Sequence, residues 1–451
     1  MKIAIIGSGI SGLAAAHALQ TEVQLTLYEA GTYFGGHTHT VDVTLPTPAG
    51  PVTHGVDTGF LVFNERTYPN LIELFEKLGV RTVASEMSFS VQAPGALDGR
   101  TLEWSGSSID TVFAQRGNLV NPRFLRMLRD LMRFNSLCTR IAEANLDADM
   151  MQPLAGFLEA HRFSNEFRDW YFLPMLGCIW SCPTDMMMKF PVATMIRFCH
   201  NHGLLQVSNR PQWRTVPGGA RHYVDRITAA IADKRLNTPV RRIERDPGAQ
   251  RAGVRIVTDS GTETFDKVIL ATHSDQSLTM LQTPTRNECE TLGAIRYQKN
   301  RAVLHTDPSV LPETRKAWAA WNYERATSRG DEASRVCLHY LLNRLQPLPF
   351  EQPVIVSLNP TRPIDPAKIL GDYDYEHPVF DQNAIRAQAR AATLQGKNHT
   401  YFAGAWMGYG FHEDGLKAGL NAARHLLGDA HRQRNAPVDP QPARRAEAVA
   451  A

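Results

Sequence analysis

The sequence predicts an α/β fold in which a Rossmann-like nucleotide-binding domain is interleaved with a second, α+β domain. A strand, a glycine turn and a helix follow one another from Lys2 to about Gln20, and the same order recurs from Tyr401 to Gly419. Between these two segments lie long stretches rich in large apolar side chains. A chain of 451 residues is long enough to build a second core from them.

The amino-terminal segment has the pattern of a dinucleotide-binding turn. The run from Lys2 to Ile6 is short and rich in isoleucine, which is typical of a buried strand. The turn that follows consists of Gly7, Ser8, Gly9, Ile10, Ser11 and Gly12. In such turns the first glycine permits the bend, the second lets the backbone approach a pyrophosphate, and the third lets the helix pack closely on the strand. The helix N-terminus offers unpaired N–H groups to the phosphates.

The second predicted strand, from Val23 to Tyr28, ends at an acidic residue. Glu29 stands about 20 residues after the first glycine, where a carboxylate accepts hydrogen bonds from ribose hydroxyls. The next part of the pattern is formed by Ala30, Gly35, Gly36, His37 and Thr38. A paired glycine in this place resembles the extended fingerprint of FAD-binding flavoproteins. Because no second Gly-x-Gly-x-x-Gly follows, the sequence predicts FAD and no separate nicotinamide site.

Four further blocks resemble the flavin amine oxidase superfamily, which includes monoamine oxidases, protoporphyrinogen oxidases and phytoene desaturases. They are Val56–Phe63, Val216–Gly219 with Thr238–Ile243, Phe265–Ala271, and Tyr401–Gly419. The resemblance implies a GR2-type FAD-binding domain. It implies that a segment passes along the isoalloxazine ring, formed by Gly59, Phe60, Leu61 and Val62. It also implies that the backbone of Val240 meets the adenine and that the strand ending at Ala271 belongs to the nucleotide domain.

The carboxyl-terminal block is the most specific of the four. The resemblance places Gly404 and Ala405 at the pyrophosphate, and it places beside the flavin Gly410, Phe411, His412 and Leu416. A helix N-terminus directed at the ring would stabilise the negative charge of the reduced flavin by about 1 kcal/mol. Covalently flavinylated members of the family use a cysteine shortly before this block. This chain has no cysteine after Cys337, so we expect FAD to be bound non-covalently.

Further strings are similar to a bacterial branch often encoded beside cyclopropane fatty acid synthases. They lie at 35–38, 58–70, 201–205, 213–219, 304–307 and 318–323. This resemblance implies an FAD-dependent oxidoreductase that transfers a hydride from an unsaturated or branched fatty acyl chain to flavin N5. Two alternatives stay open: an amine oxidase acting on a small amine, and a flavin-bearing binding protein without turnover.

Two features bear on the chemistry. Amine-oxidising relatives place a lysine near flavin N5, but the nearest equivalent here is Asn300 or Arg301, with Lys299 adjacent, which argues against amine oxidation. We predict His412 as a catalytic residue, because its imidazole would lie beside the flavin and could shuttle a proton or steady the reduced anion. In the alternative interpretation, only its backbone N–H contacts the ring.

Composition excludes other functions. The 48 Lys and Arg residues nearly balance the 45 Asp and Glu residues, so no nucleic-acid partner is expected. Cys178 and Cys182 lie near Cys199, His200 and His202, but their spacing fits no standard zinc pattern, and no metal is predicted.

The order of the blocks predicts the domain boundaries. The FAD-binding domain is expected at 1–84, 206–279 and 379–428, with a helical substrate-domain insert at 85–205, a substrate-domain sheet at 280–378 and a disordered tail at 429–451. Methionines and aromatic residues crowd the insert, where they form either an apolar tunnel for a hydrophobic substrate or ordinary core.

A predicted helix from Pro122 to Arg140 carries arginines on one face, at Arg126, Arg129, Arg133 and Arg140. Such a helix either lies on anionic lipid or is a solvated surface helix. The uncharged stretch from Ile3 to Thr21 superficially resembles an export signal, but its three glycines argue against one. We expect a cytoplasmic protein, with peripheral contact at the inner face of the membrane as the further possibility.

Overall fold

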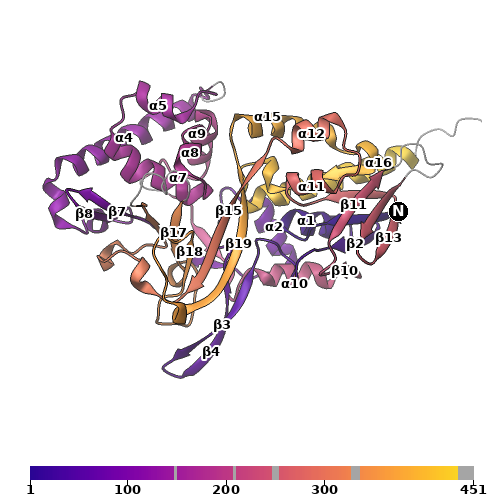
Figure 1. Cartoon of the computed structure of the whole chain (residues 1–451), viewed down its shortest axis with the longest axis horizontal. Coiled ribbons are helices and arrows are strands. Elements are labelled where there is room, and N and C mark those ends of the chain that lie inside the picture. The colour runs from indigo at the N-terminus through magenta and orange to yellow at the C-terminus, as the bar shows by residue number, and fades with distance from the viewer. Residues whose placement is uncertain (147–149, 207–209, 246–252, 327–335, 435–451) are drawn as a thin grey trace, which may run out of the picture.

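The computed structural model describes residues 1–146, 150–206, 210–245, 253–326 and 336–434. It consists of two units side by side, with β15 (Arg296–His305) and β19 (Ile369–Val379) running along the junction (Figure 1). The unit on the right of the view contains the N-terminus, and the unit on the left is capped by helices. The predicted α/β class is confirmed.

The first unit is built on a parallel sheet. Within the described ranges this sheet has five strands, in the order β10 (Asp233–Arg235), β2 (Gln24–Tyr28), β1 (Lys2–Ile6), β14 (Lys267–Leu270) and β20 (Thr400–Phe402). Every neighbouring pair is parallel. The central strand β1 is buried on both faces, which explains its apolar sequence.

Two layers cover this sheet. One face packs against α1 (Ile10–Leu19), α2 (Pro69–Leu78), α10 (Arg221–Ala229) and α16 (His412–Arg434). The other face packs against α11 (Ser274–Met280), α12 (Arg286–Leu292), α15 (Gln382–Ala391) and a small antiparallel sheet of β11 (Val240–Arg245), β12 (Val254–Thr258) and β13 (Gly261–Phe265). The sheet is therefore the middle of three layers.

Glycines let α1 approach both β1 and α16 closely. A Cβ at Gly12 would overlap the carbonyl oxygen of Gly7, and a Cβ at Gly419 would overlap the carbonyl oxygen of Ser11. Helices 1 and 16 come from opposite ends of the chain and make extensive contact. Only residues without a side chain permit this packing.

The second unit contains a mostly antiparallel sheet. Its seven strands within the described ranges are, in spatial order, β19, β15, β18 (Ile355–Leu358), β17 (Cys337–Leu341), β16 (Trp321–Glu324), β7 (Phe89–Leu97) and β8 (Arg100–Ser105). Only the β16–β7 pair is parallel among them.

A helical layer packs on this sheet. It comprises α3 (Ile109–Val112), α4 (Pro122–Glu143), α5 (Leu154–Ala160), α6 (Asn165–Phe167), α7 (Leu173–Trp180), α8 (Thr184–Met187) and α9 (Val192–Asn201), while α14 (Leu342–Leu345) follows β17. A projecting hairpin, β3 (Thr40–Thr47) with β4 (Gly50–Asp57), and a small sheet of β5 (Phe63–Asn64), β9 (Trp213–Thr215) and β6 (Val83–Ser85) complete the fold.

Three predicted boundaries need correction. The insert at 85–205 is not wholly helical, because β7 and β8 belong to the sheet of the second unit. Helix α12, predicted within the substrate-domain sheet, packs on the nucleotide sheet. The tail prediction is wrong for 429–434, because α16 continues to Arg434, and 435–451 lie outside the described residues. Among the described helices, none is both long and apolar enough to span a membrane.

Replacement of Gly419 by alanine tests the close packing of α1 and α16. The added methyl group would overlap the Ser11 carbonyl, so Gly419→Ala should lower the free energy of unfolding in urea by about 1–3 kcal/mol. Gly428 lies on the same helix with nothing within 4 Å of its ideal Cβ, so Gly428→Ala should be neutral or stabilising by up to about 1 kcal/mol. Equal stability of the two variants would contradict this packing argument.

Candidate functional site

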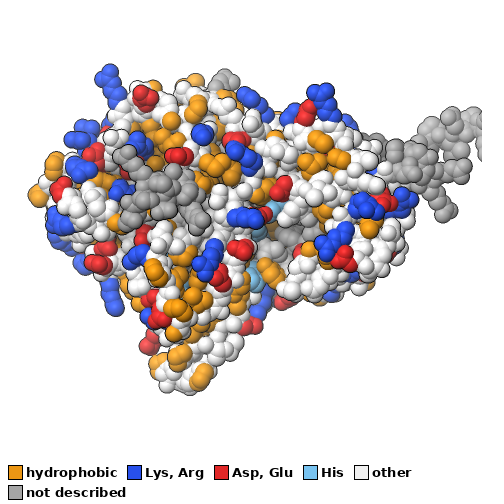
Figure 2. All heavy atoms as spheres, viewed as in Figure 1, with side chains coloured by type: hydrophobic (Ala, Val, Ile, Leu, Met, Phe, Trp, Pro, Cys, Tyr) orange, Lys and Arg blue, Asp and Glu red, His pale blue; other side chains and the backbone are white. Residues whose placement is uncertain are grey.

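A cavity of about 820 Å³ lies between the two units. The ends of β1, β2 and β14 line it on one side, and α7, β16, β17 and β19 contribute to the other. Figure 2 shows histidine side chains, in pale blue, at the junction between the two halves of the molecule. The volume of the cavity is in the range of cofactor and ligand sites.

The turn after β1 is shaped to receive an anion. Gly7 has φ +95°, a conformation that favours glycine, and Gly9 begins α1 without a side-chain cap. The first N–H groups of α1 therefore stay available to a ligand in the cavity. The Glu29 carboxylate accepts hydrogen bonds from Ser8 N at 2.9 Å, Ser8 Oγ at 2.5 Å and Gly31 N at 2.7 Å. These bonds hold the carboxylate at the end of β2.

Most of the predicted cofactor-binding residues line the cavity. They are Gly7, Ser8, Gly9, Ile10, Ser11, Glu29, Ala30, Gly35, Gly36, His37, Gly59, Phe60, Leu61, Val62, Val240, Ala271, Gly404, Ala405, Gly410, Phe411 and His412. Three predicted residues do not. Gly12 packs against the Gly7 backbone, Thr38 hydrogen-bonds to Tyr223 behind the cavity wall, and Leu416 is buried in the core of the first unit. These three support the wall without lining it.

Unpaired polar atoms mark the same part of the cavity. Trp406 Nε1 and His37 Nε2 are buried and have no hydrogen-bond partner among the described residues, and both side chains line the cavity. An isolated buried donor or acceptor is costly unless a ligand pairs with it. Together with the uncapped α1 and the glycine backbones, these atoms fit a bound dinucleotide such as FAD.

Two carboxylates hold the N-terminus of α16 at the cavity. Asp414 accepts hydrogen bonds from the backbone N–H groups of Tyr409 and Phe411, both at 3.1 Å. Glu413 accepts from the backbone N–H of Leu71 at 3.0 Å, which ties the helix start to α2. Burial raises the pKa of Asp414 to about 6. The loop from Gly410 to His412 is thereby fixed against the cavity.

His412 is part of the wall. Its ring stacks on Phe60 with a centroid distance of 3.8 Å, and its Nε2 lies 2.8 Å from Tyr223 Oη and 3.3 Å from Thr38 Oγ1. Burial lowers the pKa of His412 to about 3, so the imidazole is neutral near pH 7. Because Nε2 is engaged inside the wall, these contacts favour the alternative interpretation, in which the backbone N–H contacts the ring, and the proton-shuttle role stays a prediction.

Of the residues predicted as equivalents of the amine oxidase lysine, Asn300 is the buried one. Its Nδ2 donates to Nδ1 of His377 at 2.8 Å, and its Oδ1 accepts from Nδ2 of Asn359 at 2.8 Å. Lys299 has an 86% exposed side chain, and Arg301 pairs with Asp372 at the surface. Among the described residues that line the cavity there is no lysine.

His377 and His273 are cavity residues that the sequence did not reveal. They lie near His37, with ring centroids 5.4 Å and 6.4 Å from it. Burial lowers the pKa of His37 to about 3 and that of His377 to about 4, so both rings are neutral. No local motif marks these positions. His377 lies beside Asn300 because β19 pairs with β15. This long-range pairing cannot be read from the local sequence.

Aromatic side chains form the wall contributed by the second unit. Trp180 and Ser181 lie at the end of α7, Trp321 on β16 and Tyr340 on β17. The indole Nε1 atoms of Trp180 and Trp321 are buried without a hydrogen-bond partner in the described part of the chain.

The predicted tunnel is largely ordinary core. Many of the insert's aromatic residues and methionines pack in the core of the second unit without reaching the cavity, among them Phe157, Phe167, Phe172, Met187, Phe190 and Met195. From this insert, the cavity is reached by residues 178–181. The core interpretation therefore holds for most of these side chains.

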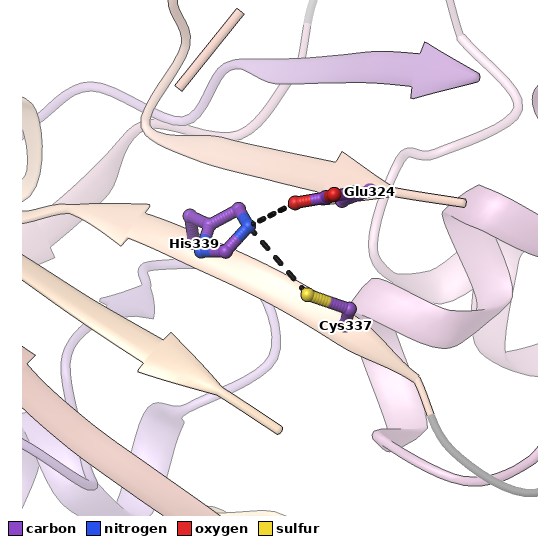
Figure 3. A group of neighbouring side chains, drawn as sticks. All are labelled: Glu324, Cys337 and His339. Carbon is purple, nitrogen blue, oxygen red and sulfur yellow. Dashed lines mark hydrogen bonds and ion pairs between the residues drawn. The ribbon is translucent and has the colours of Figure 1, made fainter. Parts of the chain in front are cut away.

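Glu324, Cys337 and His339 form a buried cluster on strands β16 and β17 (Figure 3). Their potential ligand atoms lie within 4.8 Å of one another, so these three residues could together bind a metal ion. Asp307 N donates to His305 Nδ1, so His305 Nε2 carries its proton and donates to Ser357 Oγ at 2.7 Å. Ser357 Oγ also lies 2.7 Å from His339 Nδ1, and His339 Nε2 lies 2.9 Å from Glu324. Burial lowers the pKa of His339, but Cys337 and Glu324 together raise it to about 9. A protonated imidazole has no lone pair for a metal ion, so the arrangement favours a hydrogen-bonded network over a metal site.

Comparison with known proteins agrees with a flavin site in this cavity. A family model described as flavin containing amine oxidoreductase matches residues 10–307. No curated protein sequence matches the chain. A CLA-producing fatty acid isomerase from P. acnes has a similar structure, with a TM-score of 0.66 and 17% identity over 94% of this chain and 98% of that one.

Two amine oxidases are equally similar in structure. Cyclohexylamine oxidase from Brevibacterium oxydans IH-35A gives a TM-score of 0.66 and 18% identity over 96% of this chain and 99% of that one. A putrescine oxidase gives a TM-score of 0.65 and 17% identity over 95% of this chain and 99% of that one. At such identities these structures establish the fold and leave the substrate open.

The family match covers more than half of the chain, and the cavity offers the groups that a dinucleotide requires. The superfamily resemblance and the FAD prediction are thus confirmed. The chain belongs to the flavin-containing amine oxidoreductase family and is an FAD-dependent oxidoreductase.

Proposed function

We propose that this enzyme oxidises or desaturates an unsaturated or branched fatty acyl chain, with peripheral contact to a membrane that holds it. When bound, FAD would supply the two-electron acceptor for this reaction. The observation that carries the proposal is the far wall of the cavity, which is aromatic and has no lysine among its described lining residues. Two of its tryptophans, Trp180 and Trp321, have buried indole N–H groups without a hydrogen-bond partner. An acyl chain offers the matching chemistry, a long apolar body with the two oxygens of a carboxyl or ester group at its end.

We infer cofactor roles from the cavity lining. The backbones of 7–11 and of Gly404 and Ala405 would hold the pyrophosphate, Glu29 the ribose, and Val240 the adenine. Residues 59–62 and 410–412 would enclose the isoalloxazine ring. The N-terminus of α16 would then face the ring edge that gains negative charge on reduction.

The aromatic wall contributed by the second unit would exclude water and orient the acyl chain. Trp180 and Trp321 would donate their indole N–H groups to the carboxyl or ester oxygen, while Tyr340 and Phe411 pack on the methylene groups. The neutral rings of His37 and His377 place no fixed charge beside the reacting carbon. Desaturation removes a hydride, which the flavin would accept, and a proton, which the unpaired Nε2 of the neutral His37 ring would accept.

Oxidation of a small amine is the second candidate. The aromatic faces of Trp180, Trp321 and Tyr340 and the C-terminal end of α7 would also suit a cation. Asn300 in place of lysine weighs against it. The third alternative, a flavin-bearing protein without turnover, is set aside because the family that the chain matches is described as flavin containing amine oxidoreductase.

Anaerobic reduction of the bound flavin separates the two candidates. The holoenzyme is mixed without oxygen with oleic acid, a cyclopropane fatty acid, their methyl esters or a phospholipid extract, and in parallel with cyclohexylamine and putrescine. We expect the long-wavelength flavin band to bleach with acyl compounds and to persist with amines. Bleaching by the amines alone would replace the acyl proposal with amine oxidation.

Replacement of a cavity indole tests substrate orientation. Trp321→Phe removes an N–H donor and keeps an aromatic ring, so it should weaken binding of the fatty acid roughly two- to tenfold, the cost of one hydrogen bond. Binding is measured as the shift of the flavin spectrum on titration. Trp318→Phe is the matched control, since the Trp318 indole donates to Pro312 outside the cavity. Equal effects of the two substitutions would refute the proposed contact.

The pH profile of flavin reduction tests whether His412 shuttles a proton. With a pKa of about 3, the ring is uncharged throughout the range from about pH 5 to 9, so its titration contributes no inflection there. His412→Gln should lower the rate through lost packing on Phe60 while leaving the apparent pKa values of the profile in place. Loss of an inflection near neutral pH in this variant would restore the proton shuttle.

A further inference from the structure

We propose that the enzyme docks on an anionic phospholipid surface through the outer face of α4 and the turn before it. This docking face comprises Leu119, Val120, Leu125, Arg126, Arg129 and Met132. The inference rests on the proposed function for its purpose, since a membrane holds acyl chains. Its physical evidence, the exposed apolar and basic side chains, is independent of the cavity.

The docking face is unusually apolar for a surface. Val120 is 82% exposed, Met132 56%, Leu119 51% and Leu125 42%. Most of the exposed large hydrophobic side chains in the described ranges fall between Ile109 and Met151. Scattered single exposed hydrophobics are normal in soluble proteins, but a concentration along one helix and its preceding turn indicates an interaction surface.

Helix α4 carries excess positive charge, with five arginines and two acidic residues. Two of these arginines, Arg126 and Arg129, belong to the docking face, where Arg126 also lies 3.7 Å from the Glu166 carboxylate. One of those acids, Asp130, is buried beneath Arg129 and Arg133, at 3.4 Å and 2.7 Å. The side chain of Arg126 is 51% exposed and that of Arg129 68%, so both guanidinium groups reach solvent. In Figure 2, Lys and Arg side chains gather along the left edge, over the end of the molecule that contains α4 and β8.

Charge and apolarity together select a lipid surface as the occupant. Leu125, Arg129 and Met132 are exposed and stand at positions i, i+4 and i+7 of α4, so apolar and cationic groups share one stripe of the helix. Apolar side chains would enter the interface between headgroups and acyl chains while the arginines pair with anionic headgroups. The helix belongs to the same layer as α7, whose end forms part of the cavity wall. Docking would therefore bring the substrate-binding unit to the membrane.

Vesicle flotation of the holoenzyme tests the docking face. Vesicles of phosphatidylcholine alone are compared with vesicles that contain phosphatidylglycerol, at low and high salt and without substrate. We expect co-flotation with the anionic vesicles and release by salt. The double variant Arg126→Glu/Arg129→Glu should reduce the bound fraction at least about tenfold, and Leu119→Glu/Val120→Glu should act similarly.

Matched controls separate this face from the rest of the surface. Arg424→Glu on α16 and Leu370→Glu on β19 change exposed residues far from α4 in sequence and should leave flotation unchanged. Retained flavin absorbance shows that each variant folds. Failure of the native holoenzyme to float, equal loss in the control variants, or burial of this face in a stable dimer on gel filtration would each overturn the proposal. Because no turnover is measured, none of these outcomes decides the acyl substrate.

Discussion

The close approach of α1 and α16 over β1 is the constraint on which the site depends. Gly12 lets α1 lie on the turn after β1, and Gly415 and Gly419 let α16 lie on α1. As a result, two helix N-termini from opposite ends of the chain meet at one cavity. One can receive the phosphates and the other can face the electron-accepting ring, so both ends of a dinucleotide are served by backbone groups.

The sequence predicted this half of the molecule well because its determinants are local. Three short patterns mark it: the glycine turn, Glu29 at the end of β2, and the glycine-rich start of α16. In each pattern the residue type is required for a physical reason that can be read from the sequence. Nearly all of the predicted lining residues do face the cavity. The exceptions, Gly12, Thr38 and Leu416, lie one layer behind it, a distinction that depends on three-dimensional packing and leaves no trace in spacing.

The second unit was harder to predict because its site residues meet through long-range pairing. Asn300 and His377 become partners only when β15 pairs with β19. The aromatic residues of the insert share one composition, yet Trp180 reaches the cavity while Phe167 and Phe172 fill the core. For His412, position beside the flavin was predicted, but burial and the hydrogen bond to Tyr223 set its protonation. The fold alone does not set the substrate, since the structures similar to this chain include a fatty acid isomerase and a cyclohexylamine oxidase.

A crystal structure of the holoenzyme with a cis-unsaturated fatty acid would test the central claim most directly. We predict FAD along the glycine turn with its ring between residues 59–62 and the start of α16. The acyl chain should lie against Tyr340 and Phe411, with its carboxylate within hydrogen-bonding distance of the Trp180 or Trp321 indole. A fatty acid found only outside the cavity, or an amine held against these aromatic side chains in its place, would contradict the account.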